Sequence, residues 1–213
     1  MLRTGNFKFY MLAALAVIAV LGVGTALAQS DTYQVNYYSN AHVTGAPAGY
    51  VRIDNPGTDN GANLCADIYV FDNSEELIEC CGCQLTPDGL RTLNINTDLT
   101  ANPANGFVPS TGVLKIVSAV PNPNASHPSW GQCDPTGGWS FTNQKGNIAP
   151  TADLRAWADH IQNRGAGGAY PETAEEFADS TLATWELAYL QKACFGIRQL
   201  GSGRGVCHCG TGD

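Results

Sequence analysis

The clearest alternation of apolar and polar positions lies in residues 64–71, which read LCADIYVF. Side chains alternate between the two sides of a strand, so this run predicts a strand with one aliphatic face and one mixed aromatic and polar face. The aliphatic face would consist of Leu64, Ala66, Ile68 and Val70. Its β-branched and aromatic residues also favour a strand over a helix.

Two turn signals come after this strand. Asp72, Asn73 and Ser74 are turn formers, and residues 76–83 then predict a returning strand of a hairpin. The sequence TPDG at 86–89 has the residue order of a type I turn and is followed by a further apolar run. We therefore expect a three-stranded antiparallel meander in which the third strand begins at Leu90.

Four more segments favour strands. Residues 32–38 and 50–53 are short alternating runs, and residues 113–120 are apolar on both faces, which is typical of a strand in the middle of a sheet. Residues 154–161 fit both a helix and a strand, and a strand is preferred in a chain so rich in β signals.

Residues 184–200 predict the one clear helix. Thr184 can cap it, Glu186 falls in the first turn, and Gly201 can supply a left-handed stop. Its apolar face would consist of Leu187, Leu190, Cys194 and Ile197. Cys194 is expected to bond to the sheet or to the C-terminal tail. The pattern as a whole predicts a mainly β fold, an antiparallel β-sandwich with one C-terminal α-helix, stapled by disulfides.

Residues 1–28 have the features of a secretory signal peptide. Arg3 and Lys8 precede an apolar run, and Ala26-Leu27-Ala28 has the A-x-A form of a cleavage site. We expect these residues to be removed, which leaves residues 29–213 as a single domain, either secreted or in the periplasm of a bacterium. A retained membrane anchor is the alternative.

The net charge and the cysteine count limit the kinds of partner and the compartment to be expected. A formal charge of −8 makes nucleic acids and anionic membranes poor partners, so neither nucleic-acid binding nor stable membrane insertion of the mature chain is expected. Eight cysteines in an exported chain favour disulfides, with connectivity left open by the sequence. The cysteines expected to form disulfides are Cys65, Cys80, Cys81, Cys83, Cys133, Cys194, Cys207 and Cys209.

The spacing of the clustered cysteines restricts how they can pair. Cys80 and Cys81 would point to opposite faces of a strand, while Cys81 and Cys83 share a face with α-carbons roughly 6.6 Å apart, at the edge of disulfide reach. Each is therefore expected to pair with a distant cysteine. Cys207 and Cys209 repeat the C-x-C spacing, so the two segments could face each other as two parallel disulfides or form a four-sulfur metal site. Disulfides are preferred, and no metal or other cofactor is expected.

Other chemical features are weak. His42, His127, His160 and His208 are scattered, and neither a nucleophile elbow nor a zinc-protease motif occurs. The loop at 54–61 holds oxygen donors without the spacing of an EF-hand and is interpreted as a turn. The hairpin carboxylates are interpreted as a solvated turn: Asp72, Glu75, Glu76 and Glu79. The glycines at 201–205 look like a phosphate-binding loop only in composition, because such a loop opens a helix and these glycines follow one. They are interpreted as a flexible exit from the helix.

The motifs CADIYVFD (65–72), ECCGC (79–83) and LTPDGL (85–90), with the ending GSGRGVCHC (201–209), resemble a family of exported cysteine-rich proteins of soil bacteria, particularly acidobacteria. The resemblance covers about residues 51–209. It implies a shared cysteine framework and carries no activity or catalytic residue over to this chain.

Two functions are therefore weighed. The first is a secreted structural or binding module, without catalysis, for an unknown extracellular ligand or protein. The second is a metal-binding or thiol-redox protein that uses the two C-x-C segments. A secreted hydrolase is a third and weaker hypothesis, so the sequence leaves the question of an enzyme open and leans against one.

Overall fold

The structure is a computed structural model that describes residues 32–58, 60–125, 128 and 130–212. The expected signal peptide at 1–28 lies outside the described residues and stays a prediction.

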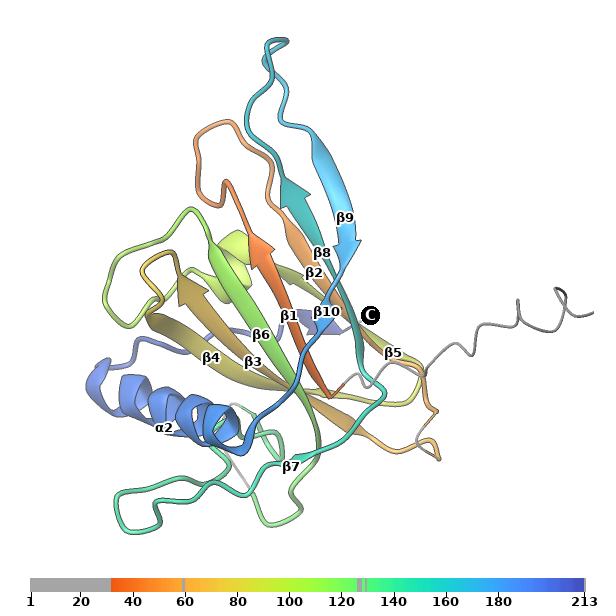
Figure 1. Cartoon of the computed structure of the whole chain (residues 1–213), viewed down its shortest axis with the longest axis vertical. Coiled ribbons are helices and arrows are strands. Elements are labelled where there is room, and N and C mark those ends of the chain that lie inside the picture. Colours follow the sequence, from red (N-terminus) through yellow and green to blue (C-terminus); the bar gives the residue numbers. More distant parts are fainter. Residues whose placement is uncertain (1–31, 59, 126–127, 129, 213) are drawn as a thin grey trace, which may run out of the picture.

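Two antiparallel sheets face each other (Figure 1). Sheet A consists of β1 (Tyr33–Tyr38), β3 (Leu64–Asp72), β4 (Leu77–Leu85), β6 (Gly112–Val120), β7 (Ala149–Pro150) and β10 (Ala178–Asp179). Sheet B consists of β2 (Tyr50–Asn55), β5 (Gly89–Asn94), β8 (Arg155–Ile161), β9 (Glu172–Glu176) and β11 (Thr211–Gly212). Sheet A has the order β10-β1-β6-β3-β4 with β7 paired to β6, and sheet B the order β11-β5-β2-β8-β9. The expected antiparallel sandwich is confirmed.

The main core lies between the sheets. The aliphatic face of β3 points inward, as its alternation predicted, and meets Val51 and Ile53 of β2. Leu93 of β5 and Ala156 of β8 join the same cluster from sheet B. Burial of these apolar side chains is the main favourable contribution that holds the two sheets together.

Sheet A is also covered on its outer face. The helix α2 (Thr184–Leu200) lies against it (Figure 1), with Leu190 packed in a second cluster that includes Tyr69 and Phe71 of β3. The loop at 121–148 covers a third cluster around Cys65. Because both faces are covered, every residue of β3 is buried. The expected central position of the strand at 113–120 is confirmed, since β6 lies between β1 and β3.

Both open sides of the sandwich are bridged. On one side, β9 pairs with β8 in sheet B and continues into β10, which pairs with β1 in sheet A (Figure 1). Phe177 lies between the two pairings, and its N–H donates to the Ala156 carbonyl at 2.8 Å. On the other side, the tail makes a parallel bridge from Val206 to Cys80 of β4 and then pairs through β11 with β5.

The expected three-stranded meander is wrong in its third strand. β3 and β4 form the hairpin, but β5 pairs with β2 in the opposite sheet. The turn at 86–89 forms, with the N–H of Gly89 donating to the carbonyl of Thr86 at 2.9 Å, but the N–H of Asp88 bonds to Asn55 at the end of β2. The crossing places Leu93 in the core between the sheets.

The helix has the expected length, but its ends are formed differently. Its N-cap is Ala183, which has no side-chain cap, so the cap expected from Thr184 is wrong. Gly201 has a φ of −74°, so the left-handed stop is wrong too. Glycine is required there for space, because a Cβ would lie 2.5 Å from the Ile197 carbonyl oxygen.

The structure also defines the secondary structure of two other segments. Residues 154–161, which fitted a helix or a strand, contain the strand β8. Residues 95–99 form a short π-helix, η1 (Ile95–Leu99), which is capped by the Asn94 side chain.

Two glycines offer a matched test of this packing. A Cβ on Gly82 of β4 would collide with the carbonyl group of Cys133 in the covering loop, whereas a Cβ on Gly196 of α2 would meet nothing within 4 Å. Gly82→Ala should therefore destabilise the fold by roughly 1–3 kcal/mol. Gly196→Ala should stabilise it by roughly 0.5–1 kcal/mol, since glycine is unfavourable inside a helix. Denaturant unfolding of both variants checks this, and equal effects would contradict the close approach of the loop to β4.

Candidate functional site

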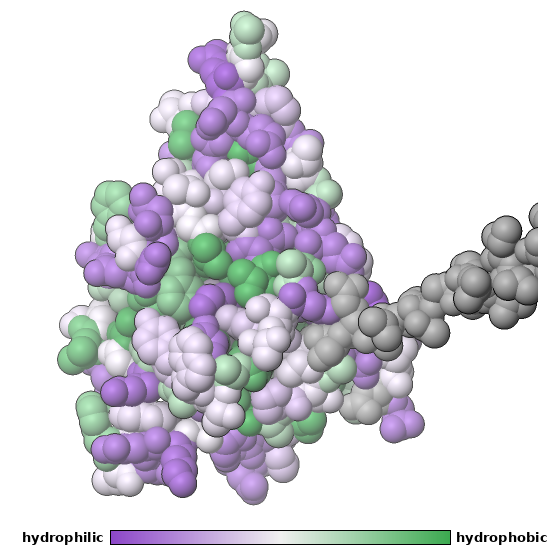
Figure 2. Space-filling model, viewed as in Figure 1, coloured by the Kyte–Doolittle hydropathy of each residue, from purple (hydrophilic) through white to green (hydrophobic). Residues whose placement is uncertain are grey.

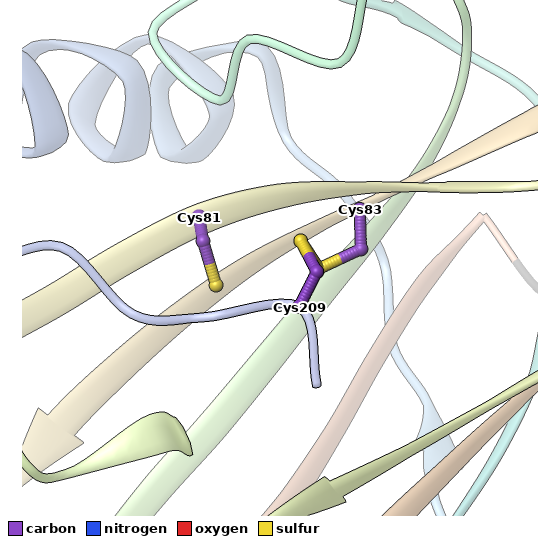
Figure 3. Close-up of side chains that lie close together, drawn as sticks. All are labelled: Cys81, Cys83 and Cys209. Atoms are coloured by element: carbon purple, nitrogen blue, oxygen red, sulfur yellow. A yellow bond between two sulfur atoms is a disulfide. The ribbon is translucent and has the colours of Figure 1, made fainter. Parts of the chain in front are cut away.

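The two C-x-C segments meet as a pair of parallel disulfides. Cys81 bonds to Cys207 and Cys83 to Cys209, with α-carbon separations of 5.2 Å and 5.4 Å, and each bridge spans 126 residues. Figure 3 shows the sulfurs of Cys81 and Cys83 on the same side of β4, facing the tail. The parallel course of tail and strand keeps both pairs in register, so the sequence argument against a Cys81–Cys83 bond holds.

Strand alternation explains the third bridge. Cys80 points to the outer face of sheet A, opposite to its neighbour, and bonds to Cys194 of α2 with α-carbons 5.8 Å apart. Cys65, also on the outer face, bonds to Cys133 of the covering loop. No cysteine is free, so the expectation of disulfides is confirmed for all eight residues.

Three of these sulfurs form a compact group. The Sγ atoms of Cys81, Cys83 and Cys209 all lie within 4.8 Å of one another. Cys81 and Cys83 are buried and Cys209 is half-buried. Sulfurs bound to each other are not thiolates, and a thiolate is the form that binds a soft metal or attacks a disulfide. The group could do either only after a bridge opens.

His160 is the one buried histidine of the described residues. Its Nε2 lies 2.9 Å from the Asn36 side-chain oxygen, and its Nδ1 lies 3.5 Å from a Glu175 carboxylate oxygen. The Tyr37 ring packs against it with centroids 3.8 Å apart. Burial lowers the pKa of His160, against the opposing effect of the nearby carboxylates. These contacts tie β1 to the β8–β9 hairpin.

The other histidines lie elsewhere. His42 contacts the Thr100 hydroxyl at 2.8 Å, and His208 is exposed, as expected for a residue between two half-cystines. His127 lies outside the described residues. Asp159 precedes His160 but bonds to Arg52 at 2.8 Å on the other side of the strand, so these sequence neighbours do not act as a pair.

The carboxylates of the β3–β4 hairpin divide into two kinds. Asp72 is buried, so the interpretation as a solvated turn is wrong for this residue. Its Oδ1 closes the turn by accepting the N–H groups of Ser74 and Glu76 at 2.8 Å and 3.0 Å. Glu75 and Glu76 are exposed, in agreement with a solvated turn.

Glu79 contradicts that interpretation, because it is fully buried on β4. Its Oε1 accepts the Asn102 N–H at 2.7 Å, while its Oε2 has no partner in the described part of the chain. Burial raises the pKa of Glu79 to about 8, although the Asn102 bond acts in the opposite direction. The sequence contained no sign of this burial, since the covering Asn102 comes from a loop distant in sequence.

The two loops with weak ligand signals have structural roles. In the 54–61 loop, the Asn55 side chain donates to the Leu85 carbonyl at 3.2 Å and so fixes the turn. The glycine-rich segment 201–205 connects α2 to the tail and is held by Asn102, whose side chain donates to a carbonyl within it at 3.1 Å.

Exposed aromatic side chains form a feature that the sequence interpretation missed. Trp185 and Tyr189, one turn apart on α2, are 72% and 46% exposed. Phe141 of the covering loop is also exposed and packs edge-on against Phe195, with ring centroids 5.1 Å apart. Figure 2 shows hydrophobic residues in the middle of the face that it draws, over β1 and β6, whereas the β8–β9 end is mostly hydrophilic.

Comparisons of the chain with family models, curated proteins and solved structures find no match. The resemblance to an exported family therefore stays a prediction. Among the described residues, no helix is long and apolar enough to cross a membrane.

Glu79 gives the fold a specific dependence on pH. Its carboxyl keeps a proton in the folded state up to a pKa of about 8 but loses it near pH 4.5 in the unfolded chain. Between these values the folded state holds more protons, so this group makes stability fall as pH rises. Glu79→Gln removes the effect, and its stability relative to the wild type should rise with pH by at most about 1.4 kcal/mol per unit.

Urea unfolding at several pH values between 5 and 8 measures this difference. Glu75→Gln, which changes an exposed carboxylate of the same hairpin, is the matched control and should show no such trend. Parallel stability curves for wild type and Glu79→Gln would contradict the raised pKa.

Proposed function

We propose that the mature chain is an exported binding or structural module without catalysis, which acts as a covalently fastened scaffold for an extracellular ligand or protein. The observation that carries this proposal is the pairing of all eight cysteines into four disulfides. Four disulfides favour an oxidising compartment outside the cytoplasm. The signal-like residues 1–28 support export, either to the periplasm or beyond the cell.

Each bridge fastens the covering loop, α2 or the tail to a strand of sheet A. Cys65–Cys133 holds the loop at 121–148, and Cys80–Cys194 holds α2. The two parallel bridges hold the tail along β4. A loop with little regular structure and a single amphipathic helix bury little apolar surface, so cross-links add the stability that a larger core would provide. This arrangement suits a protein that keeps its shape outside the cell.

The surface along α2 supports a binding role. A groove of about 570 Å³ runs beside the helix and is lined mainly by apolar side chains, with Tyr189, Ile197 and Leu200 among them. Exposed tryptophan and tyrosine are the residues that most often dominate binding energy in protein interfaces. The groove residues of α2 and the exposed Trp185 therefore give this helix an aromatic and apolar surface. The Cys80–Cys194 bridge fastens the helix to the sheet.

The second candidate is a metal-binding or thiol-redox protein, and the compact group of three sulfurs favours it. It requires that Cys83–Cys209 or Cys81–Cys207 open under physiological conditions. The half-buried Cys209 is the most accessible of the four sulfur positions in these two bridges.

Intact mass separates the two candidates. The protein is purified from its exported compartment and weighed under native and then under denaturing, non-reducing conditions. We expect a mass lower by one hydrogen for every cysteine and no adduct of a soft, thiolate-bound metal such as zinc or copper. A native mass that includes zinc or copper, or free thiols after denaturation, would overturn the proposal in favour of the second candidate.

The parallel bridges should contribute to stability in a non-additive way. Replacing Cys83 and Cys209 by Ser should cost about 2 kcal/mol, because the remaining Cys81–Cys207 bridge still joins the same two segments and only a short ring is opened. Replacing all four cysteines releases the tail and should cost about 5 kcal/mol. Guanidinium unfolding without reductant measures both variants. Equal costs for the two would show that the bridges do not act on the same closed loop.

A further inference from the structure

A small cavity lies beneath the loop at 121–148, on the outer face of sheet A. Its volume is about 10 Å³, which is enough for one water-sized occupant. Its lining includes five residues whose side chains contain oxygen, from β3 on one side and the loop on the other: Asp67, Asn122, Gln132, Asp134 and Asn147. Its two cysteines, Cys65 and Cys133, are bonded to each other, so their sulfurs are not available as ligands.

Asp67 is the residue in this cavity that needs a partner. Its side chain is 2% exposed, and its Oδ1 has no hydrogen-bond partner in the described residues. The Tyr69 hydroxyl on the same face donates to the Pro135 carbonyl at 2.7 Å and so does not reach it. Burial, and next the Asp134 carboxylate, raise the pKa of Asp67 well above its ordinary value. Burying a carboxylate charge without a partner costs free energy, so Asp67 is expected to be neutralised by a proton or by a cation.

The charges around the cavity favour a cation. Asp134 accepts the N–H and hydroxyl of Thr136 at 3.0 Å and 2.8 Å and lies 3.7 Å from Arg198. The Arg198 guanidinium therefore lies beside Asp134, whereas Asp67 has no ion pair among the described residues, so its carboxylate, when ionised, is uncompensated. The Cys133 carbonyl oxygen and Asp67 Oδ1 also come together over the α-carbon of Gly82, so two electron-rich oxygens share this space.

We propose that this cavity binds a calcium ion through the carboxylates of Asp67 and Asp134. All available donors are oxygens, the ligands that calcium prefers, and a calcium ion tolerates irregular geometry. Magnesium usually keeps several of its waters, for which a cavity of this size has no room. The ion would neutralise Asp67 and fasten the covering loop to β3 beside the Cys65–Cys133 bridge.

Calcium titration of the mature, disulfide-bonded protein tests this site. The protein is first treated with EDTA, and thermal unfolding is then followed from about 10 μM to 10 mM Ca²⁺, the range that includes extracellular calcium modules. The melting temperature should rise by about 5–10 °C at a concentration 100-fold above Kd. Equilibrium dialysis should find one calcium ion per chain.

Variants assign the effect to the cavity. Asp67→Asn should fold without calcium at least as stably as the metal-free wild type, because it removes a buried acid, and should lose the calcium-dependent rise. Asp134→Asn provides the same test if the first variant does not fold. Glu75→Gln, at an exposed position, should keep the full rise.

Three results would overturn the proposal. One is an unchanged melting temperature with no bound calcium at 10 mM. Another is an equal rise with Mg²⁺, or with Na⁺ at the same ionic strength, which would indicate a different or non-specific ion effect. The last is a full calcium response in both Asp67→Asn and Asp134→Asn.

Discussion

Sheet A has to be covered on both faces, and most other features of the structure depend on this requirement. Its central strands β3 and β6 present apolar side chains inward and, in β3, aromatic side chains outward, so either face left in water would expose a large apolar surface. Sheet B covers the inner face through complementary apolar strands. The outer face is left to α2 and to the loop at 121–148, which are weaker partners because they bury fewer apolar residues.

Two disulfides compensate for this weakness, since Cys65–Cys133 fastens the loop and Cys80–Cys194 fastens α2 to the outer face. β4 provides three of the four bridges, and its alternation directs Cys80 outward to the helix and Cys81 and Cys83 inward to the tail. Polar contacts under the helix add to the cover, since Glu186 of α2 receives the Tyr33 hydroxyl at 3.1 Å and the Lys115 ammonium group at 2.5 Å. Glu186, which the sequence placed off the apolar stripe of the helix, is therefore part of the contact with the sheet.

Features set by local periodicity could be predicted from the sequence. The two faces of β3, the length of α2 and the opposed directions of Cys80 and Cys81 all come from strand and helix geometry alone. The sheet that β5 joins could not be predicted, because the same alternation at Leu93 suits a meander and a crossing equally well.

The burial of Glu79 could not be predicted from the sequence pattern either, because the residue that bonds to its carboxylate, Asn102, lies in a loop distant in sequence. Gly201 was identified as the helix end for the wrong reason, because the crowding at Ile197 is a property of the folded turn. Both residues show that contacts between segments distant in sequence decide burial and space, which a local pattern does not contain.

The positions of the bridges also constrain when the molecule can be completed. The three bridges from β4 span 114, 126 and 126 residues, and their partners lie in α2 and the tail. Contacts so distant in sequence form late, because the entropy of closing a long loop must be overcome first. In the proposed exported setting, the β3–β4 hairpin would reach the oxidising side of the membrane well before its cysteine partners. Cys80, Cys81 and Cys83 would then remain reduced or mispaired until residues 194–209 arrive, and the parallel course of tail and strand would select the native pairs by register.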